Sequence, residues 1–515
     1  MKKHIQSLAG MTILLSMISS FVGQTTPPNE FPVKREESPA TWRRDGWNAI
    51  DKAKRLKIGK KRPKNVILFI GDGMGISTLT AARIFQGQLR GESGEENRLS
   101  FEDFPFSALS KTYQVNQQTP DSAPTMTAIV TGVKTDEGVI SVDQNVVHAD
   151  HRSVAGNEAK TIVEYAEEAG LSTGIVSTAR LTHATPAACY SHSPDRDWES
   201  DNDIFMRQKA AYDANFPDIA RQLLDFKYGD GPEVALGGGR TKFLPQNEID
   251  PEGRDRKGER LDGRDLTKEW QARSKGSAYV WNKQQFDAVD AKKTKHLLGL
   301  FEPSHMQYEI DRDSGPNGEP SLTEMTSKAI DILSQNKKGY FLMVESGRID
   351  HAHHDGNAFR SLSETVELSD AVQAAISKVH LEDTLIIVTA DHSHTFFMQG
   401  YPMRGNNILG LIREVDNSGA PEKTWKLDKD GKPMTTLGYS NGLGARKGER
   451  TMLDQATVLD PNYRQEANIP LGAETHGGED VAIYAIGPNA NLIRGSMEQN
   501  WIFYVMADGL RLGRK

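Results

Sequence analysis

Short apolar runs alternate with longer amphipathic stretches along most of the 515-residue chain. The short runs are rich in Val, Ile and Leu and are bounded by turn-forming residues, which is typical of buried strands. The longer stretches repeat apolar residues at helical spacing. This alternation predicts an α/β fold with a mostly parallel central sheet flanked by helices on both faces. The predicted strands are 65–70, 172–178, 233–236, 340–345, 384–390 and 481–486, and the predicted helices are 77–90, 158–170, 321–335 and 358–379.

Two segments break this alternation. Residues 246–275 are loop-like and dense in charge and Gly, and they belong to an excursion that we place at about 240–320. Residues 402–470 are rich in Gly, Asn, Pro and Lys, and we expect them to leave the sheet. The sequence therefore predicts one folded domain over 24–515 that carries two excursions.

The first residues have the pattern of a secretory signal peptide. Two lysines precede an apolar stretch from Leu8 to Val22, and a polar segment follows it. We expect cleavage near Gly23, so that residues 1–23 are removed and the mature protein is exported to the periplasm or the extracellular medium. The alternative is a membrane anchor, which would need about 20 apolar residues.

Charge and cysteine content add two limits. The net charge is −8 and no basic stripe is present, which argues against recognition of nucleic acid. Cys189 is the single cysteine, so no intrachain disulfide can form. Stability outside the cytoplasm must then come from the core, from bound metals or from oligomerisation.

The segment NVILFIGDGMGIS, residues 65–77, places an aspartate inside a glycine-rich loop. A strand, a glycine loop and a helix N-terminus together favour binding of a phosphate. Asp72 would repel that phosphate unless a cation lay between them. The loop is therefore either a plain turn or a place where Asp72 holds a metal that meets an anion. A dinucleotide site is disfavoured, because the glycines have the spacing G-x-G-x-G and not G-x-G-x-x-G.

Other residues of metal-ligand type follow the predicted strands. Sites in open parallel sheets form beyond the carboxyl ends of the strands, so we expect these side chains to meet. Any one of them alone is better explained as a cap or a hydrogen-bonded core residue, but their joint placement favours a metal site. They are His183 and Thr185 after 172–178, Glu345 at the end of 340–345, Asp350 and His354 in RIDHAHH, Asp391 and His392 after 384–390, and His476 before 481–486.

These residue types sort into three metal sites. One set mixes nitrogen and oxygen ligands and suits a catalytic zinc, and a second set suits another zinc with a bridging carboxylate. A third set offers only oxygen, which suits magnesium. In that order, the sets are Asp350, His354 and His476; Asp72, Asp391 and His392; and Asp72, Thr185 and Glu345.

A candidate nucleophile and a candidate anion ligand are also present. Ser122 follows Asp121 at the start of a predicted helix in TPDSAPTMTA, and zinc coordination could supply its alkoxide. The alternative for this pair is an ordinary helix cap. Arg196, in HSPDRDW, could hold two oxygens of a tetrahedral anion, or it is a surface arginine.

Together these motifs resemble the alkaline phosphatases, and the animal-type branch more closely than the best-known bacterial form. The resemblance spans roughly residues 32–507 and implies that 402–470 is a crown-type insertion. It also implies hydrolysis of phosphate monoesters through a phosphoserine on Ser122, with two zinc ions and one magnesium ion in the sets given above. The motifs include, in family order, NVILFIGDGMGIS, PDSAPTMTA, HATPAA, RLDGRDL, GLFEP, ESGRIDHAHH, VTADHSHT, GYPMRG and ETHGGEDVAIYA.

The resemblance assigns further roles that the residue pattern alone does not give. It implies that Arg196 binds the phosphate, that His183 and His351 lie beside the metals, and that His394 orients a zinc ligand. It implies a homodimer, in which Tyr401 reaches toward the partner's site and the segment TWRRDGWNAIDKA contributes to the interface.

A fourth, calcium-type site is also implied by the resemblance. Its ligands would be Glu252, the backbone carbonyl of Phe301, Glu302 and Glu319. Extra residues before Glu319 make that position the least secure match, and an ordinary charged loop is the alternative.

The chain departs from the animal enzymes in two ways. The usual cysteine pairs are missing, and no hydrophobic tail follows YVMADGLRLGRK, so no GPI anchor is expected. With the signal peptide, these departures suggest a secreted or periplasmic bacterial member of the family.

Two alternative functions remain open at this point. A sulfatase or phosphodiesterase of the same superfamily is the nearer one, because Ser122-Ala123-Pro124 resembles the start of a sulfatase signature; Met126, however, stands where that signature has Arg. The other is an exported protein that binds metal or phosphate without turnover.

Overall fold

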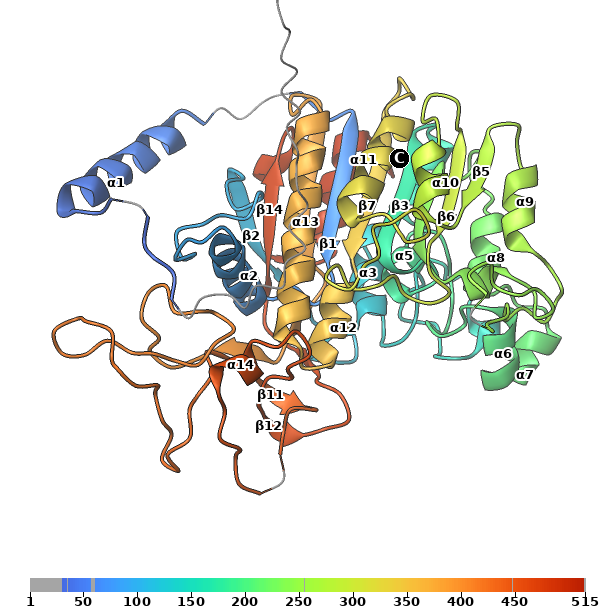
Figure 1. The fold of residues 1–515 in the computed structure, drawn as a ribbon. Coiled ribbons are helices and arrows are strands. Elements are labelled where there is room, and N and C mark those ends of the chain that lie inside the picture. Colours follow the sequence, from blue (N-terminus) through green and yellow to red (C-terminus); the bar gives the residue numbers. More distant parts are fainter. Residues whose placement is uncertain (1–29, 35, 57–60, 254, 447, 514–515) are drawn as a thin grey trace, which may run out of the picture.

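The computed structural model describes residues 30–34, 36–56, 61–253, 255–446 and 448–513, so the predicted signal peptide lies outside the described residues. Within them, ten strands form one large sheet that runs through the middle of the molecule (Figure 1). In spatial order these strands are β15 (Gly495–Glu498), β2 (Phe106–Lys111), β14 (Val481–Ile486), β8 (Thr384–Ala390), β1 (Asn65–Gly71), β7 (Tyr340–Ser346), β3 (Ser172–Arg180), β4 (Val234–Gly238), β6 (His296–Leu300) and β5 (Ser277–Val280).

The sheet is mostly parallel, as the sequence predicts. β1 pairs in parallel with β7 on one side and β8 on the other, so the carboxyl ends of these three strands lie side by side. β14 is antiparallel to both β8 and β2. Because β14 runs the opposite way, the loop that precedes it, with His476, lies at the edge where β1, β7 and β8 end.

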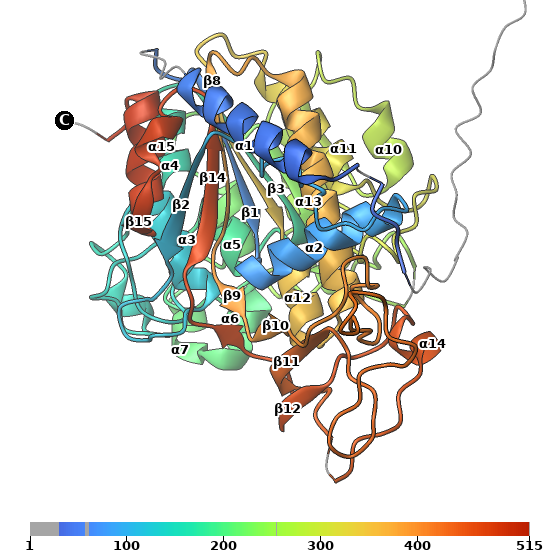
Figure 2. The same cartoon turned by 90° about the vertical axis from the view of Figure 1, so that its left-hand side faces the viewer.

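Helices cover both faces of the sheet (Figure 2). Val66, Leu68 and Ile70 point to one face and Ile67 and Phe69 to the other, so β1 is buried on both sides and is apolar throughout. One core contains residues from α2 (Ile76–Leu89), α10 (Lys283–Ala288), α11 (Leu322–Leu333), α12 (Arg348–His354) and α13 (Ala358–Lys378). The other contains residues from α3 (Ser122–Thr131), α4 (Ile162–Glu168), α5 (Ala184–Ala187), α8 (Ile219–Leu224), α9 (Leu266–Ala272) and α15 (Trp501–Leu510).

The predicted strands are confirmed, and one predicted helix is too long. The helix expected at 158–170 is α4, which begins only after Thr161, because Thr161 and Glu164 form a capping box there. Glu158 instead pairs with Val142 in an isolated bridge. The strands β2, β5, β6 and β15 were not predicted. β2 and β15 are partly exposed and β5 is short, so these three lack the long apolar run of a buried strand. β6 is buried at all five residues, but its sequence HLLGL is short and contains His and Gly.

The segment after β8 builds a second, smaller sheet. It has three strands, β10 (Phe396–Met398), β11 (Leu437–Gly442) and β12 (Ala467–Pro470), and a short helix, α14 (Gln455–Val458). In Figure 1 this orange part lies below the main sheet. The segment at about 240–320 is less separate than its composition indicates, because β5 and β6 from within it join the edge of the main sheet.

Helix α1 (Pro39–Lys54) stands apart from the rest of the chain (Figure 1). None of its residues is buried, and the Trp47 side chain is 69% exposed. Exposed tryptophans on such a helix are typical of a surface that another chain covers. In the described part of the chain, no helix is both long enough and apolar enough to cross a membrane.

Candidate active site

The glycines around Asp72 permit a close approach between the end of β1 and the segment that follows β8. Gly73 has φ +69°, and its backbone N–H donates to Asp391 Oδ1 at 3.0 Å. A Cβ at Gly73 would collide with the His394 ring, and one at Gly75 would collide with Ser393 Oγ. The loop is therefore shaped to bring Asp72 against the residues after β8, and it is not a plain turn.

The second predicted ligand set, Asp72, Asp391 and His392, meets at this point. Asp72, Asp391 and His392 are all fully buried, and one potential ligand atom from each lies within 4.8 Å of the others. His392 Nε2 is 3.3 Å from Asp72 Oδ1 and 3.4 Å from Asp391 Oδ2. Ser122 Oγ lies 3.1 Å from the same Nε2 and 3.4 Å from Asp72 Oδ1. The serine hydroxyl thus faces the ligand set directly.

The first predicted set gathers around Asp350. Asp350 Oδ1 lies 3.3 Å from His354 Nε2 and 3.4 Å from His476 Nε2, and these two nitrogens are 3.1 Å apart. His476 also stacks on His392, with 3.7 Å between ring centroids. The two sets are therefore neighbours in one cluster.

Backbone carbonyls orient the three histidines of these sets. The Nδ1 atoms of His354, His476 and His392 lie 2.6, 2.7 and 3.2 Å from the carbonyl oxygens of Glu474, Pro120 and Ser393. A histidine whose Nδ1–H donates to a carbonyl presents a bare Nε2 as a metal ligand. All three Nε2 atoms point into the cluster, which is the arrangement a metal centre requires.

The oxygen-only set holds buried atoms that lack partners. Asp72 Oδ2, Thr185 Oγ1 and Glu345 Oε1 are buried and make no hydrogen bond of ordinary geometry. Burial, with added repulsion from Asp391, raises the pKa of Glu345 to about 7, although a hydrogen bond from Ser177 opposes the shift. Burial and nearby carboxylates also raise the pKa of Asp72 well above its usual range. Such a concentration of buried, unpaired oxygens fits a bound cation.

Ser122 is not the helix cap. Asp121 is the N-cap of α3, and its side chain accepts a hydrogen bond from Ala123 N at 3.3 Å. Ser122 is the first helical residue, so its hydroxyl is free to face the cluster. The interpretation of Ser122 as a capping serine is therefore wrong.

Arg196 is held in place beside the serine. Its guanidinium pairs with the carboxylate of Asp121, and its Nη2 lies 3.2 Å from His183 Nε2. Burial alone would raise the pKa of Asp121, but the charge of Arg196 holds this pKa below its ordinary value. Arg196 is thus a fixed cation at the site and not a surface arginine.

The two histidines that the resemblance places beside the metals are neighbours of each other, and a third histidine joins them. His183 and His351 contact each other with ring centroids 5.4 Å apart. His305, which no sequence argument selected, packs against both, at 5.3 Å from His183 and 4.1 Å from His351. Its position in FEPSHMQ, after β6, gave no local signal, because only the three-dimensional packing brings it here.

His394 lies between two carboxylates. Its Nε2 is 2.9 Å from Asp350 Oδ1 and its Nδ1 is 2.6 Å from Glu474 Oε2. Burial by itself would lower the pKa of His394, but these two carboxylates raise it to about 10. Glu474 was not selected from the sequence, although its place two residues before His476 was the available signal.

Tyr401 and the calcium-type residues do not join the cluster. Tyr401 is 85% exposed on the surface of this chain. Glu302 and Glu319 are buried, and burial together with Glu302 raises the pKa of Glu319 to about 9. Glu252 pairs with Arg240 Nη2 at 3.1 Å. Among the described residues, these three glutamates do not form one of the groups whose ligand atoms lie within 4.8 Å of one another.

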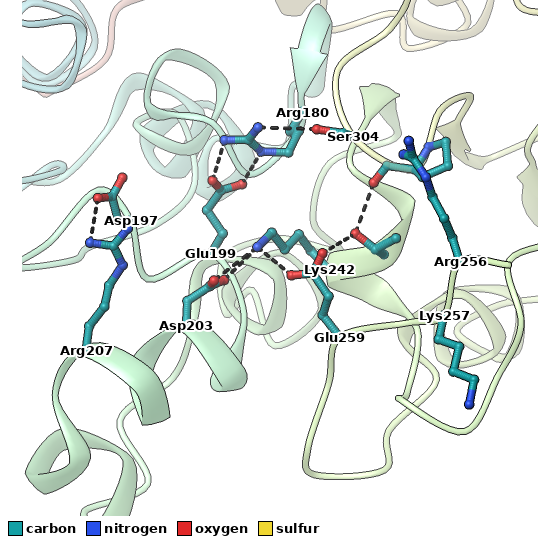
Figure 3. A pocket seen from close by; sticks show the side chains of 12 residues that line it. Arg180, Asp197, Glu199, Asp203, Arg207, Lys242, Arg256, Lys257, Glu259 and Ser304 are labelled. Atoms are coloured by element: carbon teal, nitrogen blue, oxygen red, sulfur yellow. Dashed lines mark hydrogen bonds and ion pairs between the residues drawn. The ribbon is translucent and has the colours of Figure 1, made fainter. Parts of the chain in front are cut away.

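Arg180 and its neighbours line a polar cavity of about 440 Å³ (Figure 3). The backbone N–H of Arg180 donates to His305 Nδ1 at 3.2 Å, which connects this cavity to the histidines described above. The charges of the cavity are largely paired internally. Arg180 pairs with Glu199 at 2.6 Å, and Lys242 pairs with Asp203 at 2.9 Å and Glu259 at 2.6 Å. Its lining contains neither Ser122 nor a residue of the three ligand sets, so the cluster at the ends of β1, β7 and β8 is the better candidate for the reaction site.

A buried serine beside an arginine and two adjoining sets of metal-type ligands defines the class of metal-dependent hydrolases that transfer a tetrahedral acid group. The chain belongs to the alkaline phosphatase family, since the family model described as "Alkaline phosphatase" matches residues 63–512. It hydrolyses phosphate monoesters in a metal-dependent reaction.

Animal members of the family are close relatives of this chain. It is 45% identical over 489 residues to the tissue-nonspecific alkaline phosphatase of Rattus norvegicus, which covers 93% of this chain and 90% of the relative. It is 44% identical over 492 residues to an alkaline phosphatase of Gadus morhua, covering 94% and 99% of the two chains.

Solved alkaline phosphatases share the fold. The enzyme of Thermus thermophilus superposes with a TM-score of 0.61 at 24% identity, covering 90% of this chain and 94% of that chain. The enzyme of the Antarctic bacterium TAB5 gives a TM-score of 0.59 at 22% identity, covering 88% and 99%. The predicted fold class and family are thereby confirmed.

Proposed function

We propose that this enzyme transfers the phosphoryl group of a monoester to Ser122 at a centre that holds two zinc ions and one magnesium ion. One zinc would be held by Asp350, His354 and His476, the other by Asp72, Asp391 and His392, and magnesium by Asp72, Thr185 and Glu345. The buried, unpartnered oxygens of the magnesium set carry the proposal, since burying them without a cation costs free energy. Elemental analysis of protein loaded with both metals should give two zinc ions and one magnesium ion per chain.

The residues of the chain then divide the chemistry among them. When bound, zinc lowers the pKa of an alcohol or water and stabilises negative oxygen. Arg196 holds two non-bridging oxygens of the phosphate in its fork, and Asp121 fixes the orientation of that fork. Ser122 Oγ attacks phosphorus in line, the alcohol of the substrate leaves, and a phosphoserine is formed. Water then attacks the phosphoserine from the vacated side and releases phosphate.

Replacing Arg196 by lysine should weaken this grip. A lysine keeps the charge but loses the two-pronged geometry and the contact with His183. We expect kcat/KM for an aryl phosphate to fall by about 10- to 100-fold. The matched control is Arg207→Lys, an arginine paired with Asp197 on the surface, which should leave kcat/KM unchanged. Equal kinetics for Arg196→Lys and the wild type would contradict a phosphate-binding role.

The calcium-type site is a further part of the proposal. Glu319 Oε2 is buried without a hydrogen-bond partner, and its neighbour Glu302 repels it. A cation held by Glu302, Glu319, Glu252 and the Phe301 carbonyl would remove that repulsion. Addition of calcium to metal-stripped protein should raise its unfolding temperature, and Glu319→Gln should abolish this increase.

We also propose that the mature chain, residues 24–515, is exported and acts as a homodimer with a crown-type insertion at about 402–470. The exposed tryptophans of α1 and the 85% exposed Tyr401 support a covering partner chain. The lysines and apolar stretch at the N-terminus support export. Sedimentation of the mature protein should give twice the mass of one chain.

A further inference from the structure

We infer that Glu474 is a positioning residue that holds the zinc set of Asp350, His354 and His476 in its ligating geometry. This inference rests on the proposed zinc site and assigns a residue that the family resemblance left without a role. Glu474 lies in the loop before β14, two residues from His476.

The Glu474 carboxylate is buried and both of its oxygens accept hydrogen bonds. Glu474 as a whole is 1% exposed. Oε1 accepts from the backbone N–H and the hydroxyl of Thr395, each at 2.6 Å. Oε2 lies 2.6 Å from His394 Nδ1. A carboxylate that is fixed at both oxygens has one orientation and can transmit it to its neighbours.

Glu474 reaches two of the zinc ligands by separate routes. Through its side chain it fixes His394, whose Nε2 lies 2.9 Å from Asp350 Oδ1. Through its backbone carbonyl it accepts from His354 Nδ1 at 2.6 Å. One residue therefore sets both the carboxylate ligand and a histidine ligand.

The third ligand is tied to the same strand pair. His476 lies on β13 (His476–Gly477), which pairs with His394 on β9 (Ser393–His394). Thr395, the residue that follows β9, bonds to the two residues that precede β13. Its backbone N–H donates to Glu474 Oε1 and to the carbonyl of Thr475. The loop from 474 to 477 is thus fastened to β9, and all three ligands depend on that fastening.

A direct ligand role for Glu474 is the competing interpretation. One potential ligand atom each from His354, His394 and Glu474 lies within 4.8 Å of the others. Against this, both Glu474 oxygens already accept from other groups, and His354 turns its Nδ1 toward the Glu474 carbonyl. Its Nε2 faces Asp350, which places the metal on the other side of the ring.

The test is the variant Glu474→Gln, made in the full mature chain. Glutamine keeps the size, but its amide nitrogen must face either His394 Nδ1 or the Thr395 donors, and one of these contacts is lost. We expect zinc to bind about 10- to 100-fold more weakly, measured by competition with a chromophoric chelator. Half-maximal activity should need more zinc by the same factor, while KM for an aryl phosphate at saturating zinc should stay unchanged because Arg196 is untouched.

Two further variants separate positioning from other roles. Glu479→Gln makes the same change in the same loop, at a carboxylate that accepts from Ser393 Oγ at 2.6 Å. Among the described residues, this carboxylate forms no hydrogen bond with a histidine of the zinc sets, so the zinc affinity of the variant should match that of the wild type. Glu474→Asp keeps the charge, but its shorter side chain withdraws the carboxylate. Its zinc affinity should lie between those of Glu474→Gln and the wild type.

Two results would overturn the positioning role. In one, Glu474→Gln binds zinc as tightly as the wild type and only lowers the unfolding temperature of the metal-free protein, which is a purely structural effect. In the other, no concentration of zinc restores activity, which makes Glu474 itself a ligand. The wild type is measured in parallel. If it bound no zinc, that result would overturn the proposed metal centre itself.

Discussion

Ser122→Ala should lower kcat for phosphate monoesters by at least about 10³-fold, while the protein remains folded. The loss is large because Ser122 Oγ is the proposed nucleophile, 3.1 Å from His392 Nε2 inside the ligand cluster. Stability should change little, because the cap of α3 is Asp121 and Ser122 is not the N-cap. The measurement is the rate of phosphate release from an aryl phosphate, with the unfolding temperature recorded on the same sample.

The matched control is Ser363→Ala. Within the part of the chain that the structure describes, the hydroxyl of Ser363 bonds only to the Phe359 carbonyl in its own helix, α13, so this variant should keep wild-type activity. Acid quenching during turnover should trap phosphate on the peptide that contains Ser122 in the wild type and the control. Trapping on another residue, or substantial activity in Ser122→Ala, would contradict the nucleophile assignment.

Asp72→Asn should affect function and stability in opposite directions. Asp72 is fully buried, and its pKa is raised by burial first and then by Asp391, Asp350 and Glu345. A raised carboxyl pKa means that the folded state holds the proton more tightly than the unfolded state does. In the metal-free protein this contribution to stability is complete below about pH 4 and is lost as the pH rises toward the raised value. Asparagine carries no charge, so it avoids the cost of burying a carboxylate beside other carboxylates. The free energy of unfolding of the metal-free variant should therefore rise by roughly 1–3 kcal/mol at neutral pH.

The same substitution should abolish function. Asp72 belongs to two of the proposed ligand sets, and an amide does not bridge metals as a carboxylate does. We expect kcat to fall by at least about 10³-fold and the added metals to give little further stabilisation. Chemical unfolding with and without metals measures both effects. The control Asp213→Asn, at a surface ion pair with Lys209, should change neither. A less stable metal-free Asp72→Asn protein would contradict the account.

The sequence predicts the centre of the sheet because that part is buried on both faces. β1, β7 and β8 lie between two helical layers, so each is a continuous apolar run that stands out from its flanks. β15 at one edge of the sheet and β2 beside it carry exposed polar residues, and nothing local separates FSALSK or GSME from a loop. The helix expected at 158–170 was too long because the capping box at Thr161 sets the start of α4.

The same distinction applies to the site. Asp72, Asp391 and Glu345 could be selected from the sequence because a charged residue directly at the end of a buried strand needs a partner. His305, Glu474 and the Asp121–Arg196 pair act through contacts between segments far apart in the chain. Their roles depend on register and packing, which no local pattern states. His476 likewise reaches the site because β14 runs antiparallel to β8. Its position can be explained only once the order of the strands in the sheet is known.

The central claim is that this metal cluster cleaves phosphate monoesters, and one comparison tests it most directly. An aryl phosphate, an aryl sulfate and an aryl phosphodiester are offered to the mature enzyme at mildly alkaline pH, each before chelation, after chelation and after zinc and magnesium are restored. The account predicts that the monoester is hydrolysed far faster than the other two, that chelation stops this hydrolysis and that the metals restore it. Faster hydrolysis of the sulfate or the diester, or monoester hydrolysis that survives removal of the metals, would contradict it.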